Sequence, residues 1–528
     1  MESKRTIFEV GGKPFIAIAG EVHNSSSSNA EYMLGVWEKA QEQGLNTLLL
    51  PVSWELVEPV EGQFDFKLVE TIILQARERN MHLILLWFGS WKNAACMYAP
   101  EWVKTDTKRF PRAQVEVGKN KTFLASLYGT PYTTLSYLGE NTWKADAKAF
   151  AKFMEHLKSF DEKEQTVLGV QVENETGLLG SAREHSKEAD AVFASKVPGE
   201  FVSYMRGHTG TMDPEIREAI ESGAAEGNWK EVFGVAAEEL FSAYHVASFV
   251  EKVASAGKKA YDLPMSVNCW LDKGDEPGNY PTGGPTAKVM EVWKYATPSI
   301  DVFCPDIYVH NFLEVCDNYT KLDNPLFIPE TAIHSHCAPR LVYCIGHYHA
   351  ACFAPFGFEE MGEPFGNSMG ALFGVDVNDP LLSTPQKVSE YRFCCDAISN
   401  MMDLITQRYG TDDLQAAMAE NTEEGADTML FGEFGFQIIT EHPYMSRKDG
   451  VCLVLRADEN TFYLLGNGCI INYFSTNERK PNCDIISLEE GLFENGKWIN
   501  GRRLNGDESA VISFEKFGLL KLKVFNYE

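Results

Sequence analysis

Short apolar runs alternate with amphipathic segments from the start of the chain to about residue 410. This alternation is typical of parallel strands wrapped by helices, because parallel neighbours need a long crossover between them. Eight strands are expected, at 15–21, 47–51, 82–88, 167–175, 265–270, 301–308, 326–330 and 353–358. The expected helices include 31–43, 68–80, 144–160, 236–256 and 389–407.

Eight such strands predict an α/β fold, a (β/α)8 TIM barrel over residues 1–410. The alternative is a doubly wound open sheet, which usually carries a glycine-rich phosphate loop after its first strand. Here that position reads GEVHNSSSSN, which is not such a loop. A long polar stretch at about 176–234 predicts an insertion after the fourth strand, as a lid or a subunit contact.

Residues 411–528 have a different character. Segments such as TFYLLGNGCIINYF are rich in β-branched and aromatic residues, and polar turns such as NGKWINGRRLNGDE separate them. This pattern predicts a C-terminal all-β, sandwich-like domain. We expect it to brace the barrel or to form an oligomer contact, which leaves a homo-oligomer open.

The formal net charge of −28 restricts the partners of the chain. Such a field repels nucleic acid and anionic membrane surfaces, but it does not oppose a neutral small molecule such as a sugar. We therefore expect neither a nucleic-acid partner nor a membrane partner.

Twelve cysteines are scattered without a CxxC pair of zinc-like spacing, and free thiols suit a reducing compartment. The N-terminal sequence MESKRTIFEVGGKPF has no apolar segment of the signal-peptide kind. No run approaches the roughly 20 apolar residues of a membrane span. These features predict a cytoplasmic protein.

Polar residues close the expected strands, and a TIM barrel carries its reactive groups at those ends. The candidates are Glu21, His23, Trp54, Glu55, Trp87, Trp91, Glu173, Asn174, Glu175, Asp306, Tyr308, Glu330 and Glu359. Two carboxyl groups across one mouth are what glycoside hydrolysis needs, about 5–5.5 Å apart in a retaining enzyme. The tripeptide ENE, followed by TG, and the later Glu330 predict Glu175 and Glu330 as the catalytic pair.

The remaining candidates are less specific. Trp54, Trp87 and Trp91 are either core residues or a platform for the apolar face of a pyranose. Side chains alternate along a strand, so Glu173 should face the same way as Glu175 and support it.

Histidines offer weaker signals. His23 is either a substrate contact or a structural residue. The pairs His334/His336 and His347/His349 have a metal-like spacing without an accompanying carboxylate set, so no metal and no cofactor are expected.

The stretch QVENETG resembles the acid/base motif of glycoside hydrolase clan A. GEVH, followed by NTLLLPVSWELVEPVEGQFDF, resembles family 35, in its bacterial β-galactosidase-like branch with a C-terminal β-domain, over nearly the whole chain. The resemblance implies that Glu175 is the proton donor and Glu330 the nucleophile. It also implies that Asn174 holds the sugar 2-hydroxyl and that Tyr308 lies beside the nucleophile.

The chain departs from the family pattern in the sugar-contacting shell. Many members read W-N-x-H-E-P at the second strand, where this chain has Glu55 and Val57, and their preceding tyrosine is Pro51 here. Their CAEW segment has no match, and YAPEWV instead resembles family 42. These departures leave hydrolysis intact and weaken galactose as the glycone.

Together these features predict a retaining, exo-acting β-glycoside hydrolase, foremost a β-galactosidase on oligosaccharides. The alternatives are a β-glucosidase or transglycosylase on the same scaffold, a metal-dependent barrel hydrolase, and a non-catalytic carbohydrate-binding protein.

Overall fold

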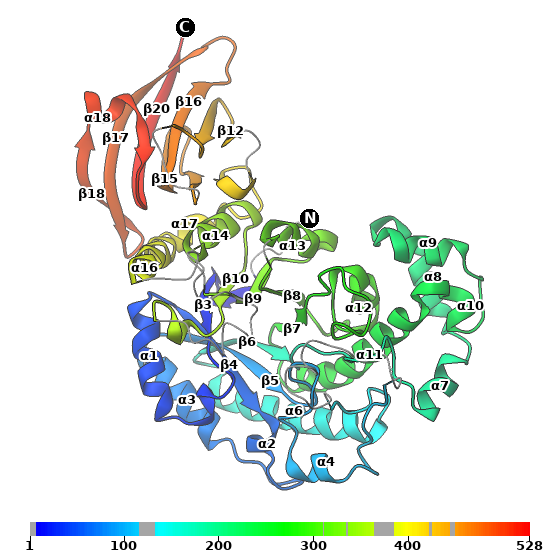
Figure 1. The fold of residues 1–528 in the computed structure, drawn as a ribbon. Helices are drawn as coiled ribbons and strands as arrows, with labels where there is room; N and C mark the ends of the chain where they lie inside the picture. Colours follow the sequence, from blue (N-terminus) through cyan, green and yellow to red (C-terminus); the bar gives the residue numbers. More distant parts are fainter. Residues whose placement is uncertain are drawn as a thin grey trace.

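The computed structural model describes residues 7–115, 133–309, 311–333, 336–363, 385–421, 425–443 and 449–528. Parallel strands close an eight-stranded barrel in the order β10-β3-β4-β5-β6-β7-β8-β9 (Figure 1), which confirms the predicted fold. The strands are β3 (Ala17–Glu21), β4 (Thr47–Ser53), β5 (His82–Phe88), β6 (Val167–Val172), β7 (Met265–Trp270), β8 (Val302–Ile307), β9 (Phe327–Thr331) and β10 (Cys352–Pro355).

Helices surround the barrel and bury their apolar stripes against it. The main ones are α1 (Tyr32–Glu42), α3 (Lys67–Glu78), α6 (Glu140–Asp161), α11 (Ala237–Ala260), α12 (Met290–Ala296), α13 (Phe312–Tyr319), α14 (Cys337–Tyr343) and α16 (Pro385–Asn400). The helix expected at 389–407 is instead two helices, because the chain bends after α16 before α17 (Met402–Thr406).

Small and apolar side chains fill the interior of the barrel, as layers of alternating strand residues do in this fold. At the N-terminal end of the strands, β1 (Phe8–Val10) and β2 (Lys13–Phe15) form a hairpin. Phe8 is 2% exposed and packs edge-on against Phe327, at a centroid distance of 5.9 Å. The hairpin therefore closes this end of the barrel with an apolar plug.

The fourth strand is shorter than predicted. β6 ends at Val172, and the following Glu173 and Glu175 have positive φ values of 62° and 44°. The expectation that Glu173 and Glu175 alternate along a strand is therefore wrong, because both residues lie in the turn beyond it. Left-handed backbone at a non-glycine residue costs on the order of 1–3 kcal/mol, and such residues cluster at functional sites.

Helices follow β6 where the insertion is predicted. They are α7 (Lys187–Phe193), α8 (Gly199–Gly207), α9 (Pro214–Ser222) and α10 (Trp229–Phe233), and they form a lobe beside the barrel (Figure 1). Trp229 anchors this lobe by packing edge-on against Phe241 of α11, at a centroid distance of 5.2 Å. Asn228 and Glu231 form a capping box that starts α10.

The C-terminal strands form two antiparallel sheets around a second apolar core. One sheet has the order β11-β14-β15-β20-β17-β18 and the other β12-β13-β16-β19. The strands are β11 (Leu414–Met418), β12 (Ala426–Phe431), β13 (Phe434–Ile439), β14 (Val451–Arg456), β15 (Thr461–Asn467), β16 (Cys469–Ser475), β17 (Asn482–Glu494), β18 (Lys497–Leu504), β19 (Ile512–Phe514) and β20 (Gly518–Tyr527).

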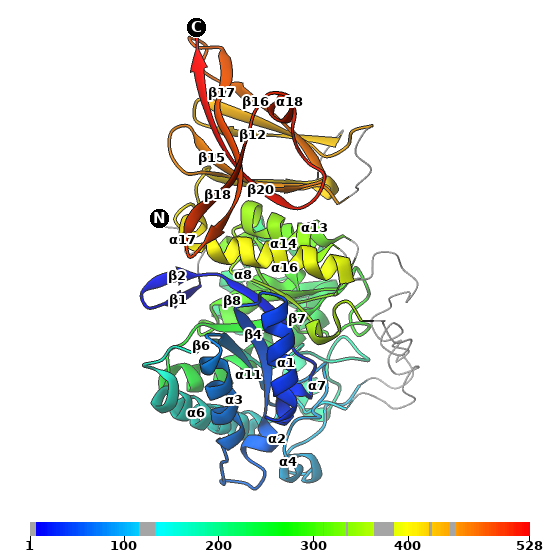
Figure 2. The same cartoon turned by 90° about the vertical axis from the view of Figure 1, so that its left-hand side faces the viewer.

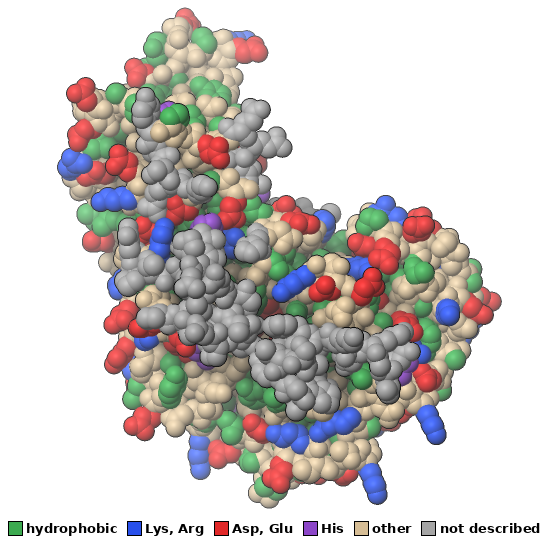
Figure 3. All heavy atoms as spheres, in the orientation of Figure 1, with side chains coloured by type: hydrophobic (Ala, Val, Ile, Leu, Met, Phe, Trp, Pro, Cys, Tyr) green, Lys and Arg blue, Asp and Glu red, His purple; other side chains and the backbone are tan. Residues whose placement is uncertain are grey.

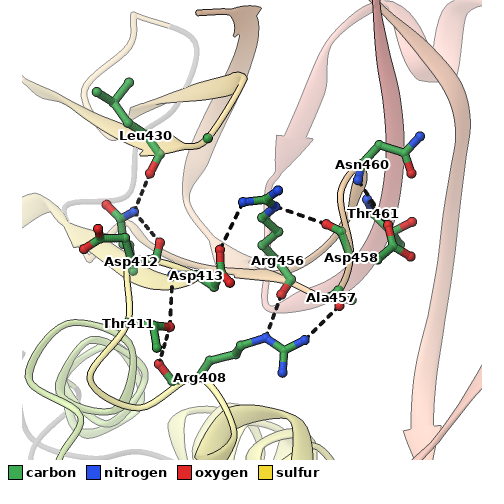
Figure 4. A network of polar contacts seen from close by, with 12 residues as sticks. Arg408, Thr411, Asp412, Asp413, Leu430, Arg456, Ala457, Asp458, Asn460 and Thr461 are labelled. Atoms are coloured by element: carbon green, nitrogen blue, oxygen red, sulfur yellow. Dashed lines mark hydrogen bonds and ion pairs between the residues drawn. The ribbon is translucent and has the colours of Figure 1, made fainter. Parts of the chain in front are cut away.

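These sheets stand on the side of the barrel that carries α14, α16 and α17 (Figure 2). Arginines link the two parts (Figure 4). Arg408 donates hydrogen bonds to the carbonyl oxygens of Arg456 and Ala457, at 3.1 and 2.8 Å, and Arg456 lies 3.3 Å from Asp413. The start of the β-sheet region is therefore tied to the last helix before it.

Acidic side chains are spread over the face seen in Figure 3, with cationic side chains among them, over both the barrel and the C-terminal sheets. This distribution fits a solvated acidic surface rather than one concentrated anionic patch. Within the described ranges, no helix has both the length and the apolar character needed to cross a membrane.

Candidate active site

Three polar residues form the last interior layer at the C-terminal end of the barrel. Glu21 follows Ala17 and Ala19 at alternate positions of β3, and Asp306 follows Val302 and Cys304 on β8 in the same way. Asn268 lies near the end of β7, in register with Cys304 of β8. It donates to Asp306 Oδ2 at 2.8 Å and accepts from the backbone N–H of Glu175 at 2.9 Å.

The two predicted catalytic carboxyl groups meet at this layer. Glu175, Asp306 and Glu330 each have a carboxyl oxygen within 4.8 Å of the others, and all three side chains are buried. Tyr308 donates its hydroxyl hydrogen to Glu330 Oε2 at 2.7 Å, and the Asn268 amide lies 3.4 Å from Glu330 Oε1. Both contacts are donors, which stabilise a carboxylate in its ionised form.

Burial raises the pKa of Glu175 to about 7, and the charge of Glu330 adds to this shift while Lys92 opposes it. Burial and the charge of Glu330 also raise the pKa values of Asp306 and Glu21 well above their ordinary range. The carboxyl groups of Glu21, Glu175 and Asp306 therefore resist ionisation. They surround Glu330, whose carboxylate contacts two hydrogen-bond donors.

Lys92 supplies a positive charge among these groups. It is 3% exposed, and its Nζ donates to Asn174 Oδ1 at 3.0 Å and lies 5.1 Å from the centroid of the Phe88 ring. Burial lowers the pKa of Lys92, but the carboxyl groups of Glu330 and Glu175 outweigh this effect and the pKa is raised. Lys92 is therefore an ammonium ion at neutral pH.

Glu173 supports the loop that carries Lys92. Its carboxylate accepts the backbone N–H of Trp91 at 2.8 Å. Burial, followed by the neighbouring Asp146, raises its pKa well above the ordinary range. Asp146 on α6 in turn accepts the backbone N–H of Ser90 at 2.9 Å. These two buried carboxyl groups hold the chain between β5 and Lys92.

The predicted tryptophan platform needs correction. Trp54, Trp87 and Trp91 are at most 1% exposed, and protein groups cover their faces. The Trp87 ring stacks on Phe153 of α6, and Trp91 packs edge-on against Phe249 of α11. Tryptophans that close apolar strands are core residues here, because these indoles point away from the barrel axis toward the helices.

Two other predicted substrate contacts, Glu55 and His23, have partners outside the carboxyl cluster. Glu55 at the start of α2 (Trp54–Val57) forms an ion pair with Lys104 at 2.9 Å, and both side chains are about one-third exposed. His23 packs edge-on against Phe356 after β10, and its Nε2 lies 3.4 Å from Glu360. His23 thereby joins the loops after β3 and β10.

The histidine pairs considered as metal ligands have other contacts. His336 contacts Glu420 at 2.7 Å, and His349 lies 3.2 Å from the carbonyl of Leu414, whereas His334 lies outside the described residues. Within the described part of the chain, the Glu175–Asp306–Glu330 cluster is the one group of carboxyl, imidazole or thiol ligands close enough to hold a metal ion.

Lys92 and Asn268 are absent from the predicted site, and Glu21 and Asp306 were considered there only as strand ends. A signal for two of them was present in the sequence. Glu21 and Asp306 each end a period-two series of interior residues, as in AIAGE and VFCPD. Lys92 follows its strand by four residues, and only the folded loop brings it back over the barrel.

Comparison with known proteins adds an independent finding. The family model "Glycosyl hydrolases family 35" matches residues 7–107. The segment that is similar to family 35 contains β3, β4, β5, Glu21 and Lys92, whereas Glu175 and Glu330 lie beyond it. The model "Domain of unknown function (DUF5597)" matches residues 396–514, which include most of the C-terminal sheets.

Individual relatives are similar over limited spans. A β-galactosidase of Xanthomonas manihotis is 36% identical over 83 residues, which is 15% of this chain and 14% of that protein. The solved β-galactosidase of Bacillus circulans sp. alkalophilus is 13% identical with a TM-score of 0.48, over 74% of this chain and 57% of its own. The exo-β-1,4-mannosidase Op5Man5 of Opitutaceae bacterium strain TAV5 is 13% identical with a TM-score of 0.43, over 75% and 62%. The chain thus spans less than two thirds of each of these proteins.

Proposed function

We propose that this protein is a retaining, exo-acting β-glycoside hydrolase, and foremost a β-galactosidase on short oligosaccharides. The observation that carries the proposal is the pairing of Glu175 with Glu330 in the last layer of the barrel. The two carboxyl groups are close together, and their surroundings differ in the way that a proton donor and a nucleophile require.

In the first step, Glu330 attacks the anomeric carbon while Glu175 donates its proton to the leaving oxygen. The Tyr308 hydroxyl and the Asn268 amide, which contact Glu330, stabilise its carboxylate before attack. A pKa of about 7 leaves Glu175 largely protonated at neutral pH. In the second step, Glu175 accepts a proton from water, and the resulting hydroxide releases the sugar from Glu330.

The short separation favours retention of configuration. An inverting enzyme needs room for a water molecule between the sugar and its base, with the carboxyl groups about 6.5–9.5 Å apart. The oxygens of Glu175 and Glu330 that lie within 4.8 Å of each other leave no such room. The segment that is similar to family 35 and the galactosidase relatives support a β-galactoside as the first substrate to test. Oligosaccharides short enough to be imported fit a cytoplasmic enzyme.

The test is a panel of nitrophenyl glycosides: β-galactoside, β-glucoside, β-fucoside, α-arabinoside and β-glucuronide. Wild type should cleave one β-glycoside, and Glu330→Gln should lose about three orders of magnitude or more, since the covalent step is removed. Formate or azide should restore turnover in Glu330→Gly. If the β-glucoside is cleaved fastest, the glycone is glucose and the proposed mechanism still holds. Unimpaired turnover by Glu330→Gln would refute the proposal.

A further inference from the structure

Several buried polar atoms of the site have no partner among the described residues. They include Asn174 Nδ2 and both carboxyl oxygens of Glu21. Both residues are 0% exposed. The neighbour of Glu21 is the carboxyl group of Glu330, with which it can only share a proton. Leaving a buried polar group unsatisfied costs on the order of 1–3 kcal/mol, so such atoms indicate the place of a hydrogen-bonding ligand.

The hydrogen bond from Lys92 determines which way the Asn174 amide faces. An ammonium group is a donor only, so the atom that it contacts at 3.0 Å must be the amide oxygen. The amide nitrogen, with two donor hydrogens, must then face away from Lys92. Without this bond, the two orientations of the amide would compete.

Glu21 offers the complementary chemistry. Its side chain lies on the barrel axis above Ala17 and Ala19, and the charges of Glu330, Lys92 and Glu175 all act on it. An unpartnered carboxyl group at this position is an acceptor for a sugar hydroxyl. Each hydroxyl of a sugar can both donate and accept, so donor and acceptor atoms of the protein can bind one monosaccharide together.

We propose that Lys92 is a positioning residue that holds the Asn174 amide with its nitrogen toward the sugar, while Glu21 accepts a hydroxyl hydrogen from the same sugar. The inference rests on the proposed function and narrows its substrate class to a neutral glycone. A uronic acid would have to bury a carboxylate beside Glu330 and among the carboxyl groups of Glu21 and Asp306, and a buried charge without a partner is costly.

The first experiment compares the best nitrophenyl glycoside with its 2-deoxy analogue, because the Asn174 amide is expected at the 2-hydroxyl. The ratio of the two kcat/KM values should fall about tenfold or more in Lys92→Met and equally in Asn174→Ala. The double variant should lose nothing further. Lys258→Met is the matched control, since Lys258 is half-buried and bound to Asp301 at the opposite end of the barrel. An unchanged ratio in Lys92→Met would overturn the role of Lys92.

The pH profile separates positioning from a general loss of packing. Glu175 is faced by Glu330 and Asp306, by Lys92, and by Lys273 after β7. Lys92 lowers the pKa of Glu175, so Lys92→Met should move the alkaline limb of kcat/KM to higher pH, and Lys92→Arg should restore it. A limb that stays in place would contradict the proposed arrangement.

Glu21→Leu, which removes both acceptor oxygens, tests the acceptor with the 3-, 4- and 6-deoxy analogues. For one analogue, the ratio of the kcat/KM of the parent glycoside to that of the analogue should fall about tenfold in the variant. A structural effect would lower all four rates alike and would refute this role. If wild type cleaves no glycoside, the proposed function fails, and calorimetry of the five monosaccharides of the panel decides the inference. Binding of a neutral sugar that Lys92→Met and Glu21→Leu both weaken would support it, and undiminished or absent binding would overturn it.

Discussion

The two ends of the barrel are built from the same eight strands and differ in almost every physical respect. At the N-terminal end, Phe8 closes an apolar interior with Phe327 and its neighbours. Near the C-terminal end, the same strands carry Glu21, Asn268 and Asp306, with Lys92 close to their carboxyl groups. One end buries hydrocarbon, and the other buries charge.

This difference shows how the fold divides stability from chemistry. Burial of apolar surface stabilises the closed end. The open end holds carboxyl groups whose pKa values are raised and two residues in left-handed backbone, and both features oppose folding. We therefore expect substitutions at the closed end to change stability without changing activity. Substitutions at the open end should lower activity and can raise stability.

The largest effect is expected for Glu175→Gln at the open end. For an oligosaccharide with an unactivated leaving group, kcat/KM should fall about 10²–10⁴-fold, because the leaving oxygen receives no proton. The loss should be smaller for a nitrophenyl glycoside, whose leaving group needs less assistance. Steady-state kinetics on both substrates measure this, with exposed Glu188→Gln as control. Equal losses on the two substrates would contradict an acid role for Glu175.

The next effect is expected for Phe8→Ala at the closed end. Removal of this buried ring should lower the free energy of unfolding by about 3–5 kcal/mol, because a cavity replaces its contacts. Urea unfolding measures the change, and kcat/KM of the folded protein should match wild type. A specific fall in kcat would show that the two ends are coupled.

A smaller effect concerns stability against pH at the open end. The pKa of Glu175 is about 7 in the folded protein against an ordinary value of 4.5, so its ionisation opposes folding as pH rises through this window. Glu175→Gln is neutral throughout and should be more stable than wild type at pH 8 by on the order of 1–3 kcal/mol. The difference should vanish below about pH 3.5, a unit under the ordinary pKa, where Glu175 is protonated in both states. Urea unfolding at both pH values measures it, and a variant less stable at pH 8 would refute the assigned environment.

The smallest effect is expected for Lys13→Ala at the closed end. Lys13 forms an ion pair with Asp403 at 3.1 Å, but the two side chains are 70% and 63% exposed. Water and salt screen such a pair, so the loss should stay below about 0.5 kcal/mol. The same unfolding measurement checks it, and a loss comparable to that of Phe8→Ala would mean that the hairpin, rather than its buried ring, holds this end closed.

Periodicity located the barrel strands to within a few residues, because strand and helix patterns are local properties of the chain. It failed at the end of β6. Glu173 and Glu175 directly follow the apolar run in the sequence, but their backbone is left-handed and no longer part of the strand. Composition also misplaced the tryptophans. An indole at a strand end suits a sugar or a core equally well, and only the helix packed against it decides between them.

The sequence by itself determined the eight-stranded barrel, and it predicted the pair Glu175 and Glu330. Apolar periodicity and a short motif at a strand end are both local features of the sequence. Only the tertiary structure decided what surrounds that pair. Glu21, Lys92, Asn268 and Asp306 come from four separate segments of the chain. Their roles depend on distance and burial, and these exist only once barrel closure brings the strand ends together.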